Sequence, residues 1–238
     1  MLKILYQDAY LIVIHKPAGL LVHRTYLAAD AEQFALQLLR DQIGQHVYPV
    51  HRLDRPTSGV LLFGLDSETT AALKEQFTER QVRKQYLAVV RGYTAESGRI
   101  DHPLRKPRDY FKRREQYATA EHKEAVSDYE TLAQIELPIA VRPYQTSRYS
   151  LVRVMPHHGR THQIRRHLAH ISHPIIGDSR YGDGAHNQSF RDHFDSNRLL
   201  LLAHVLTFIH PHTAETVTLT TDLDEDFKRI LDKFDWSL

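Results

Sequence analysis

Short runs of apolar residues, many of them alternating with polar ones, recur along most of this 238-residue chain. Alternation with a period of two is typical of strands that bury one face, and several runs are rich in β-branched and aromatic residues. The pattern predicts strands at residues 3–7, 11–16, 59–65, 86–92, 127–135, 148–155, 199–210 and 216–220.

Helical periodicity is confined to a few segments. Apolar residues three and four positions apart form stripes within residues 34–43, 73–77 and 227–234. Asp222 and Glu225 resemble a capping box that would begin the last of these helices.

One further helix is predicted after Gly159, with Thr161 as its cap and an end before Pro174. Many strands with few helices, in no strict alternation, predict an α+β fold class. We expect a largely antiparallel mixed β-sheet with flanking helices.

The composition is ordinary for a globular protein, with 42% hydrophobic and 25% charged residues. The length fits one large domain or two small ones. The absence of cysteine excludes disulfides, thiolate metal sites and cysteine nucleophiles. The apolar run at residues 9–14 is too short, and too closely flanked by charges, for a signal peptide or membrane span. We therefore expect a cytoplasmic protein without a membrane partner.

Positive charge is concentrated in two segments, although the net charge is only +2. Residues 105–114 hold six basic side chains and one acid, and residues 157–170 hold three arginines and five histidines without an acid. A polyanion such as RNA would bind to local charge of this kind and not to the net charge.

The sequence "HRLDRPTSG" at residues 51–59 places Asp54 between Arg52 and Arg55. Neighbouring cations keep a carboxylate ionised, and an oriented carboxylate is a candidate nucleophile or base. The same residue types also form plain surface turns with an ion pair, and the nine residues alone favour that interpretation.

Four ordered motifs resemble those of the RluA-type pseudouridine synthases, and the similarity covers almost the whole chain. They are "HKPAG" at 15–19, "HRLDRPTSG" at 51–59, "RKQYLAVVRG" at 83–92 and "GRTHQIRRHLAHISHPIIGD" at 159–178. The resemblance implies the pseudouridine-synthase fold with a central active-site cleft. It also implies one catalytic domain over residues 1–238, without an S4-type RNA-binding extension.

The resemblance implies that Asp54 is catalytic, that Tyr86 lies against the target base and that Arg165 pairs with the Asp54 carboxylate. Arg52 would occupy the space that a flipped uridine leaves, or it would clamp a phosphate. The reaction requires neither cofactor nor metal. The residues expected to bind RNA are Arg52, Arg55, Lys112, Arg113, Arg114, Arg160 and His162.

Within the family, the chain most resembles a subgroup that modifies a uridine in the T stem of tRNA, uridine 65. "LVHR" at 21–24, "RDQIGQHV" at 40–47 and "RPTSGVLL" at 55–62 carry this similarity, whereas the basic segment at 105–123 departs from the subgroup's pattern. We expect a tRNA substrate, no protein partner and a monomer.

Two other groups of residues invite different interpretations. Lys16, at the end of an apolar run, is expected to be a solvated charge. His162, His167, His170 and His173 lack the spacing and the supporting carboxylate of a metal site, so we expect them to contact RNA or neighbouring backbone.

Two alternative functions compete with that of an RNA-modifying isomerase. A carboxylate-dependent hydrolase of nucleosides or glycans would use two paired carboxylates, and we expect no second acid of the matched motifs to pair with Asp54. A non-catalytic RNA-binding module would have lost Asp54 or Arg165, and both are present. The isomerase is therefore the working hypothesis.

Overall fold

A computed structural model describes residues 1–23, 33–108 and 119–238. The chain forms two compact units. Unit 1 comprises Met1–Tyr86 and Leu201–Lys233, and unit 2 comprises Leu87–Leu200 and Phe234–Leu238. The described strands form mixed, mostly antiparallel sheet with flanking helices, which confirms the α+β class. The single catalytic domain stays a prediction.

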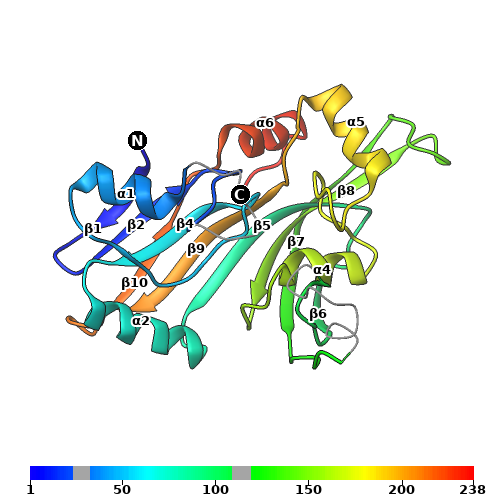
Figure 1. Ribbon diagram of the computed structural model, residues 1–238. Coiled ribbons are helices and arrows are strands. Elements are labelled where there is room, and N and C mark those ends of the chain that lie inside the picture. The colour runs from blue at the N-terminus through cyan, green and yellow to red at the C-terminus, as the bar shows by residue number, and fades with distance from the viewer. Residues whose placement is uncertain (24–32, 109–118) are drawn as a thin grey trace. The chain divides into compact units, whose positions relative to one another are not determined.

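Unit 1 is built on strands in the order β1-β2-β4-β9, with β10 beside β9 and β3 beside β4 (Figure 1). β4 and β9 run parallel, and the other pairs are antiparallel. The strands are β1 Lys3–Gln7, β2 Leu11–Lys16, β3 Tyr48–Pro49, β4 Ser58–Gly64, β9 Leu201–Ile209 and β10 Thr216–Thr220.

Helices cover both faces of the unit 1 sheet. The helices are α1 Ala35–Ile43, α2 Ser67–Thr78 and α6 Glu225–Lys233. Ile14 and Phe63 pack in one core cluster with Leu39 of α1, whereas Val13 and Leu62 pack in another with Leu73 of α2. Because both faces are buried, β2 and β4 read as continuous apolar runs.

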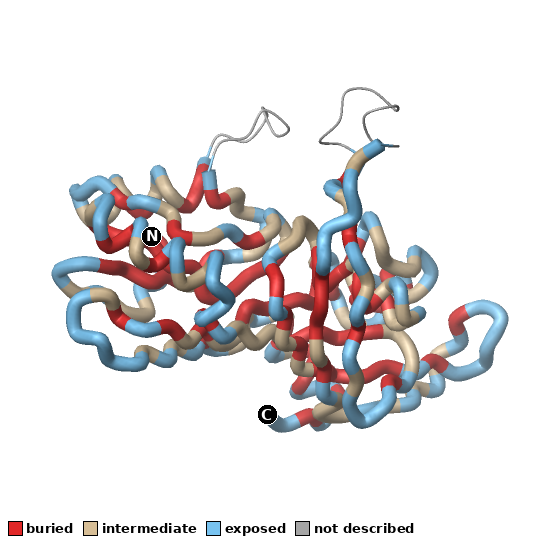
Figure 2. Tube along the Cα trace, turned by 90° about the horizontal axis from the view of Figure 1, so that it is seen from below, coloured by how far each residue is buried: buried red, intermediate tan, exposed pale blue. Residues whose placement is uncertain are grey.

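Unit 2 contains the sheet order β5-β8-β7-β6, in which β6, β7 and β8 are antiparallel neighbours. The elements are β5 Arg83–Arg91, β6 Ser97–Asp101, β7 Val126–Leu137, β8 Ser147–Pro156, α4 Gln163–His170 and α5 Gly184–Phe194. β5 begins in unit 1 and ends in unit 2. Buried stretches follow the strands of each unit (Figure 2).

All eight predicted strands are present, and helices form in the four predicted regions. Both predicted caps are wrong. Asp224 caps α6, because its Oδ1 accepts the N–H of Phe227 at 3.1 Å. α4 begins after His162, which has φ 55° and no side-chain cap bond. No helix of the described ranges is long and apolar enough to cross a membrane.

Candidate active site

The segment that carries Asp54 is a tight turn leading into β4. The Thr57 N–H donates to the Asp54 carbonyl at 3.1 Å, which closes the turn. Leu53 is buried in the core cluster of unit 1, and the Asp54 side chain is half-buried. The buried Leu53 side chain anchors the backbone, while Asp54 remains partly exposed to solvent.

Lys16 ties this turn to the "HKPAG" motif, so the expectation of a solvated charge was wrong. Lys16 is fully buried, and its Nζ donates to the carbonyls of Pro17 (2.9 Å), Leu20 (2.8 Å) and Arg55 (3.2 Å). An ammonium group has three donors, which suits three inward-pointing carbonyls. The Gly19 N–H also donates to the Arg55 carbonyl at 2.8 Å. Two distant motifs are thereby joined at the residue after Asp54.

The last residues of "HRLDRPTSG" are structural. Ser58 Oγ donates to Asp224 Oδ2 at 2.6 Å, and Asp224 caps α6. Gly59 has φ 117°, and a Cβ there would lie 2.1 Å from the Ala203 carbonyl of β9. Glycine is required where two parallel strands approach so closely.

Tyr86 lies in the part of β5 that belongs to unit 1. Its ring packs against the core cluster that includes Leu53 and Ala203. Burial, and then the negative charge of Asp54, raise the pKa of the Tyr86 hydroxyl. The structure therefore brings Tyr86 into the electrostatic reach of Asp54, although they are far apart in sequence.

Arg52 and Arg55 are exposed on either side of Asp54. The Nε of Arg55 donates to the Gly19 carbonyl at 3.0 Å, so this side chain also braces the turn. Both residues present cations on the surface next to the carboxylate, and their contacts with RNA stay predictions.

Arg165 forms a buried, bidentate ion pair on α4 in unit 2. Its Nε and Nη2 lie 2.7 and 2.8 Å from the two carboxylate oxygens of Asp178. Burial alone would raise the pKa of Asp178, but the hydrogen bonds and charge of Arg165, with the N–H groups of Tyr181 and Arg180, lower it. The guanidinium is therefore held in one orientation. The expected pairing of Arg165 with Asp54 stays a prediction.

Asn187 holds the backbone around Asp178 in place. Asn187 Nδ2 donates to the Asp178 carbonyl at 3.0 Å, and Asn187 Oδ1 accepts the Gly177 N–H at 2.7 Å. Asp178 and Asn187 support Arg165 and are not among the site residues predicted from the sequence. The available signal was that Asp178 is the only acid between residues 157 and 178.

The other predicted contacts of unit 2 lie close to α4. Nδ1 of His162 lies 3.0 Å from the Tyr181 hydroxyl, and Nε of Arg160 donates to the Glu124 carbonyl at 2.9 Å. The Arg165 guanidinium lies over the Tyr181 ring, 5.2 Å from its centroid. Lys112, Arg113 and Arg114 lie outside the described residues.

Two of the four histidines contact backbone as expected. His167 Nε2 lies 3.1 Å from the His102 carbonyl, and His173 Nδ1 lies 2.9 Å from the Arg91 carbonyl. Burial of the His167 side chain is the main cause that lowers its pKa to about 4. Within the described ranges, no three His, Asp or Glu side chains are grouped as metal ligands would be.

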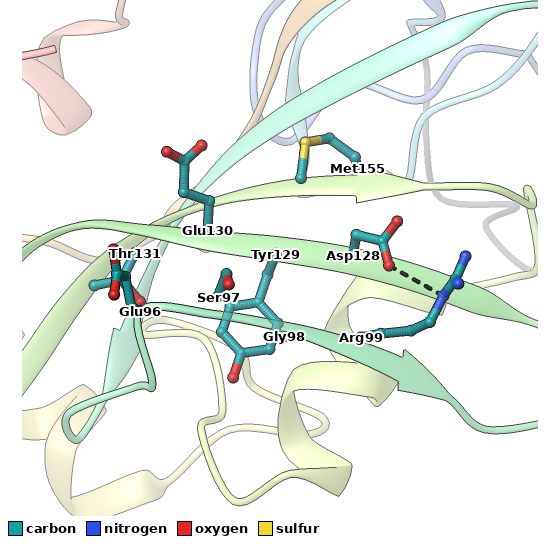
Figure 3. A pocket seen from close by; sticks show the side chains of 9 residues that line it. All are labelled: Glu96, Ser97, Gly98, Arg99, Asp128, Tyr129, Glu130, Thr131 and Met155. Atoms are coloured by element: carbon teal, nitrogen blue, oxygen red, sulfur yellow. Dashed lines mark ion pairs between the residues drawn. The ribbon is translucent and has the colours of Figure 1, made fainter.

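A pocket on the β6-β7-β8 surface contains none of the predicted site residues (Figure 3). Its volume is about 630 Å³, and its lining includes Glu96, Asp128 and Glu130 with the single cation Arg99. Two of these acids are in ion pairs, because Asp128 lies 3.2 Å from Arg99 and Glu130 lies 2.7 Å from Arg153.

Comparisons with known proteins give one consistent answer. The profile of the family described as RNA pseudouridylate synthase matches residues 10–170. tRNA pseudouridine synthase C of Pasteurella multocida is 51% identical over 237 residues, covering 100% of this chain and 98% of that protein. The protein of the same name from Haemophilus influenzae is 50% identical over 236 residues, covering 99% of both.

Solved structures agree with the sequence relatives. Human RNA pseudouridylate synthase domain containing 1 superposes with a TM-score of 0.72 at 25% identity, covering 94% of this chain and 84% of that one. Human RNA pseudouridylate synthase domain containing 4 gives 0.71 at 25% identity, covering 99% and 94%.

Proposed function

The chain belongs to the RNA pseudouridylate synthase family, and from this premise we propose that it acts on tRNA, at uridine 65 of the T stem. The family reaction makes the enzyme an isomerase that converts uridine to pseudouridine. Relatives named tRNA pseudouridine synthase C, about half identical over the full chain, support tRNA as the substrate. The choice of uridine rests on the resemblance of residues 21–24, 40–47 and 55–62.

The observation that carries the chemistry is the Asp54 carboxylate on a braced turn, in the electrostatic reach of Tyr86. Pseudouridine formation breaks the bond between uracil N1 and ribose C1′, turns the uracil and joins C5 to C1′. The C5 hydrogen is lost and N1 gains one, so the formula is unchanged and no cofactor is consumed. We assign to Asp54 the nucleophilic or basic step at the sugar or ring.

Tyr86 would lie against the target base. Because its pKa is raised, the hydroxyl stays protonated near neutral pH and does not compete with Asp54 as a base. An uncharged aromatic ring is suited to stacking on an extruded uracil.

Arg165 would orient the Asp54 carboxylate. The bidentate pair with Asp178 supports this proposal, because it fixes the guanidinium before substrate binds. Arg52, Arg55, Arg160 and His162 would contact RNA phosphate and sugar groups.

The test is to incubate the enzyme with an unmodified tRNA transcript and to map pseudouridine by a chemistry that marks it. We expect one new pseudouridine at position 65, and none when that position is cytidine. Pseudouridine confined to ribosomal RNA would contradict the substrate assignment. Release of free uracil would favour a hydrolase.

We also propose that the enzyme acts as a monomer, and that it acts in the cytoplasm, where tRNA is abundant. Sedimentation of the purified enzyme at micromolar concentration tests the first part, and fractionation of cells tests the second.

A further inference from the structure

Segments from two basic regions of the sequence line one pocket of unit 2. The pocket has a volume of about 300 Å³. Its charged lining residues are the cations Arg105, Lys106, Lys123 and Arg160 and the acid Glu121. Arg105 and Arg160 come from segments that the sequence marks as basic but does not place together.

Main-chain hydrogen bonds hold the walls of this pocket in place. The Leu104 N–H donates to the Lys123 carbonyl at 2.8 Å, and the Lys123 N–H donates back at 3.1 Å. Arg160 joins the third segment through its bond to the Glu124 carbonyl at 2.9 Å. Lys106 and Lys123 are exposed, so their side chains reach solvent from a fixed framework.

The surroundings of the pocket add further positive charge. Arg166 of α4 donates to the Arg105 carbonyl at 2.6 Å. His102 stacks on His170 with ring centroids 3.8 Å apart. Burial lowers the pKa of His102, and the charges of His170, Arg166 and His122 lower it further. A lowered pKa favours the neutral form of the His102 imidazole, so the added cation is the Arg166 guanidinium, which favours an anionic ligand in this region.

We propose that this pocket binds a phosphodiester group of the substrate RNA. Cations on a rigid wall suit phosphate oxygens, and such contacts position a nucleic acid without reading its sequence. The inference rests on the proposed function, because the RNA in question is the tRNA substrate. It adds an anchoring site on the surface of unit 2 to the residues already expected to bind RNA.

The test compares two double variants. Lys106→Gln with Lys123→Gln removes two pocket charges without altering a main-chain bond. Lys74→Gln with Lys228→Gln removes two exposed charges of unit 1 and serves as the matched control. Dissociation constants for the tRNA transcript are measured between about 50 and 200 mM KCl, a range over which phosphate contacts change affinity strongly.

We expect the pocket variant to bind tRNA about 3- to 10-fold more weakly, with a slope of log affinity against log salt flatter by about 0.7–0.9 per lost contact. The single-turnover rate at saturating enzyme should match wild type. Unfolding midpoints should be the same for all three proteins. The control variant should keep the wild-type affinity and slope.

Affinity and slope equal to those of the control would overturn the proposal. Competition for the pocket by polyglutamate and not by RNA would assign it to an acidic protein and would also overturn it. If the tRNA assignment itself is wrong, the wild-type enzyme will form no pseudouridine in the transcript. That failure is distinct from a failure of the pocket variant to lose affinity.

Discussion

Replacing Lys16 with methionine would remove an ammonium group on which two loops of the site depend. Methionine has a similar length and is apolar, so the core around the side chain should stay filled. The carbonyls of Pro17 and Leu20 would lose the donors that now lie at 2.9 and 2.8 Å. The Arg55 carbonyl would keep the Gly19 N–H at 2.8 Å.

The expected loss of stability follows from the two carbonyls left without that donor. A hydrogen bond to a charged group contributes about 1.5–3 kcal/mol, so two of them amount to about 3–6 kcal/mol. Removing a buried charge offsets part of this loss, because an ammonium is costly to desolvate. We therefore expect the free energy of unfolding to fall by about 2–4 kcal/mol.

Urea denaturation measures this loss, and Lys3→Met is the control. Lys3 makes an exposed ion pair with Asp222 at 2.5 Å, and such pairs contribute about 0–1 kcal/mol. Because Lys16 bonds to the residue that follows Asp54, the single-turnover rate should also fall by about tenfold or more. A Lys16→Met enzyme as stable and as fast as the control would refute the reasoning.

Three further predictions concern buried supports. Asp178→Ala leaves the Arg165 guanidinium buried without its carboxylate, so the free energy of unfolding should fall by about 3–5 kcal/mol. Urea denaturation measures this loss, and a value below about 1 kcal/mol would contradict the prediction. His167 has a folded pKa of about 4, below the ordinary value, so the unfolded state takes up the proton first. The free energy of unfolding should therefore fall by up to about 1.4 kcal/mol per pH unit as the pH drops from about 6.5 to 4. The His167→Gln variant should show a smaller decrease over the same pH range, and an unchanged decrease would contradict this assignment. Gly59→Ala places a Cβ against the Ala203 carbonyl and should lower the midpoint of urea unfolding. An unchanged midpoint would show that β4 and β9 can move apart at this point without loss of stability.

The fold could largely be predicted from sequence because its strands are long and strongly apolar. The sequence pattern does not predict β3, which has only two residues, nor β6 and α5, for physical reasons. β6 reads "SGRID", with only Ile100 buried, and α5 begins with glycine and buries only one large apolar side chain, Phe190. A short strand stabilised by its neighbours leaves little periodicity in its own residues.

The supports of the site were less predictable than its reactive groups. The resemblance supplied Asp54, Tyr86 and Arg165, whereas no local pattern relates residue 54 to residue 86. Lys16 was misjudged because its burial depends on a carbonyl 39 residues away. Asp178 was overlooked, although a single acid in a basic segment is a signal that sequence reasoning can use.

The central claim is that the Asp54 carboxylate performs the isomerisation, and Asp54→Asn tests it most directly because it keeps the shape of the side chain and removes its charge. The measurement is the single-turnover rate of pseudouridine formation in the tRNA transcript at saturating enzyme. The account predicts that the product is not formed while tRNA affinity stays within about threefold of wild type. A rate within about tenfold of wild type would contradict the claim.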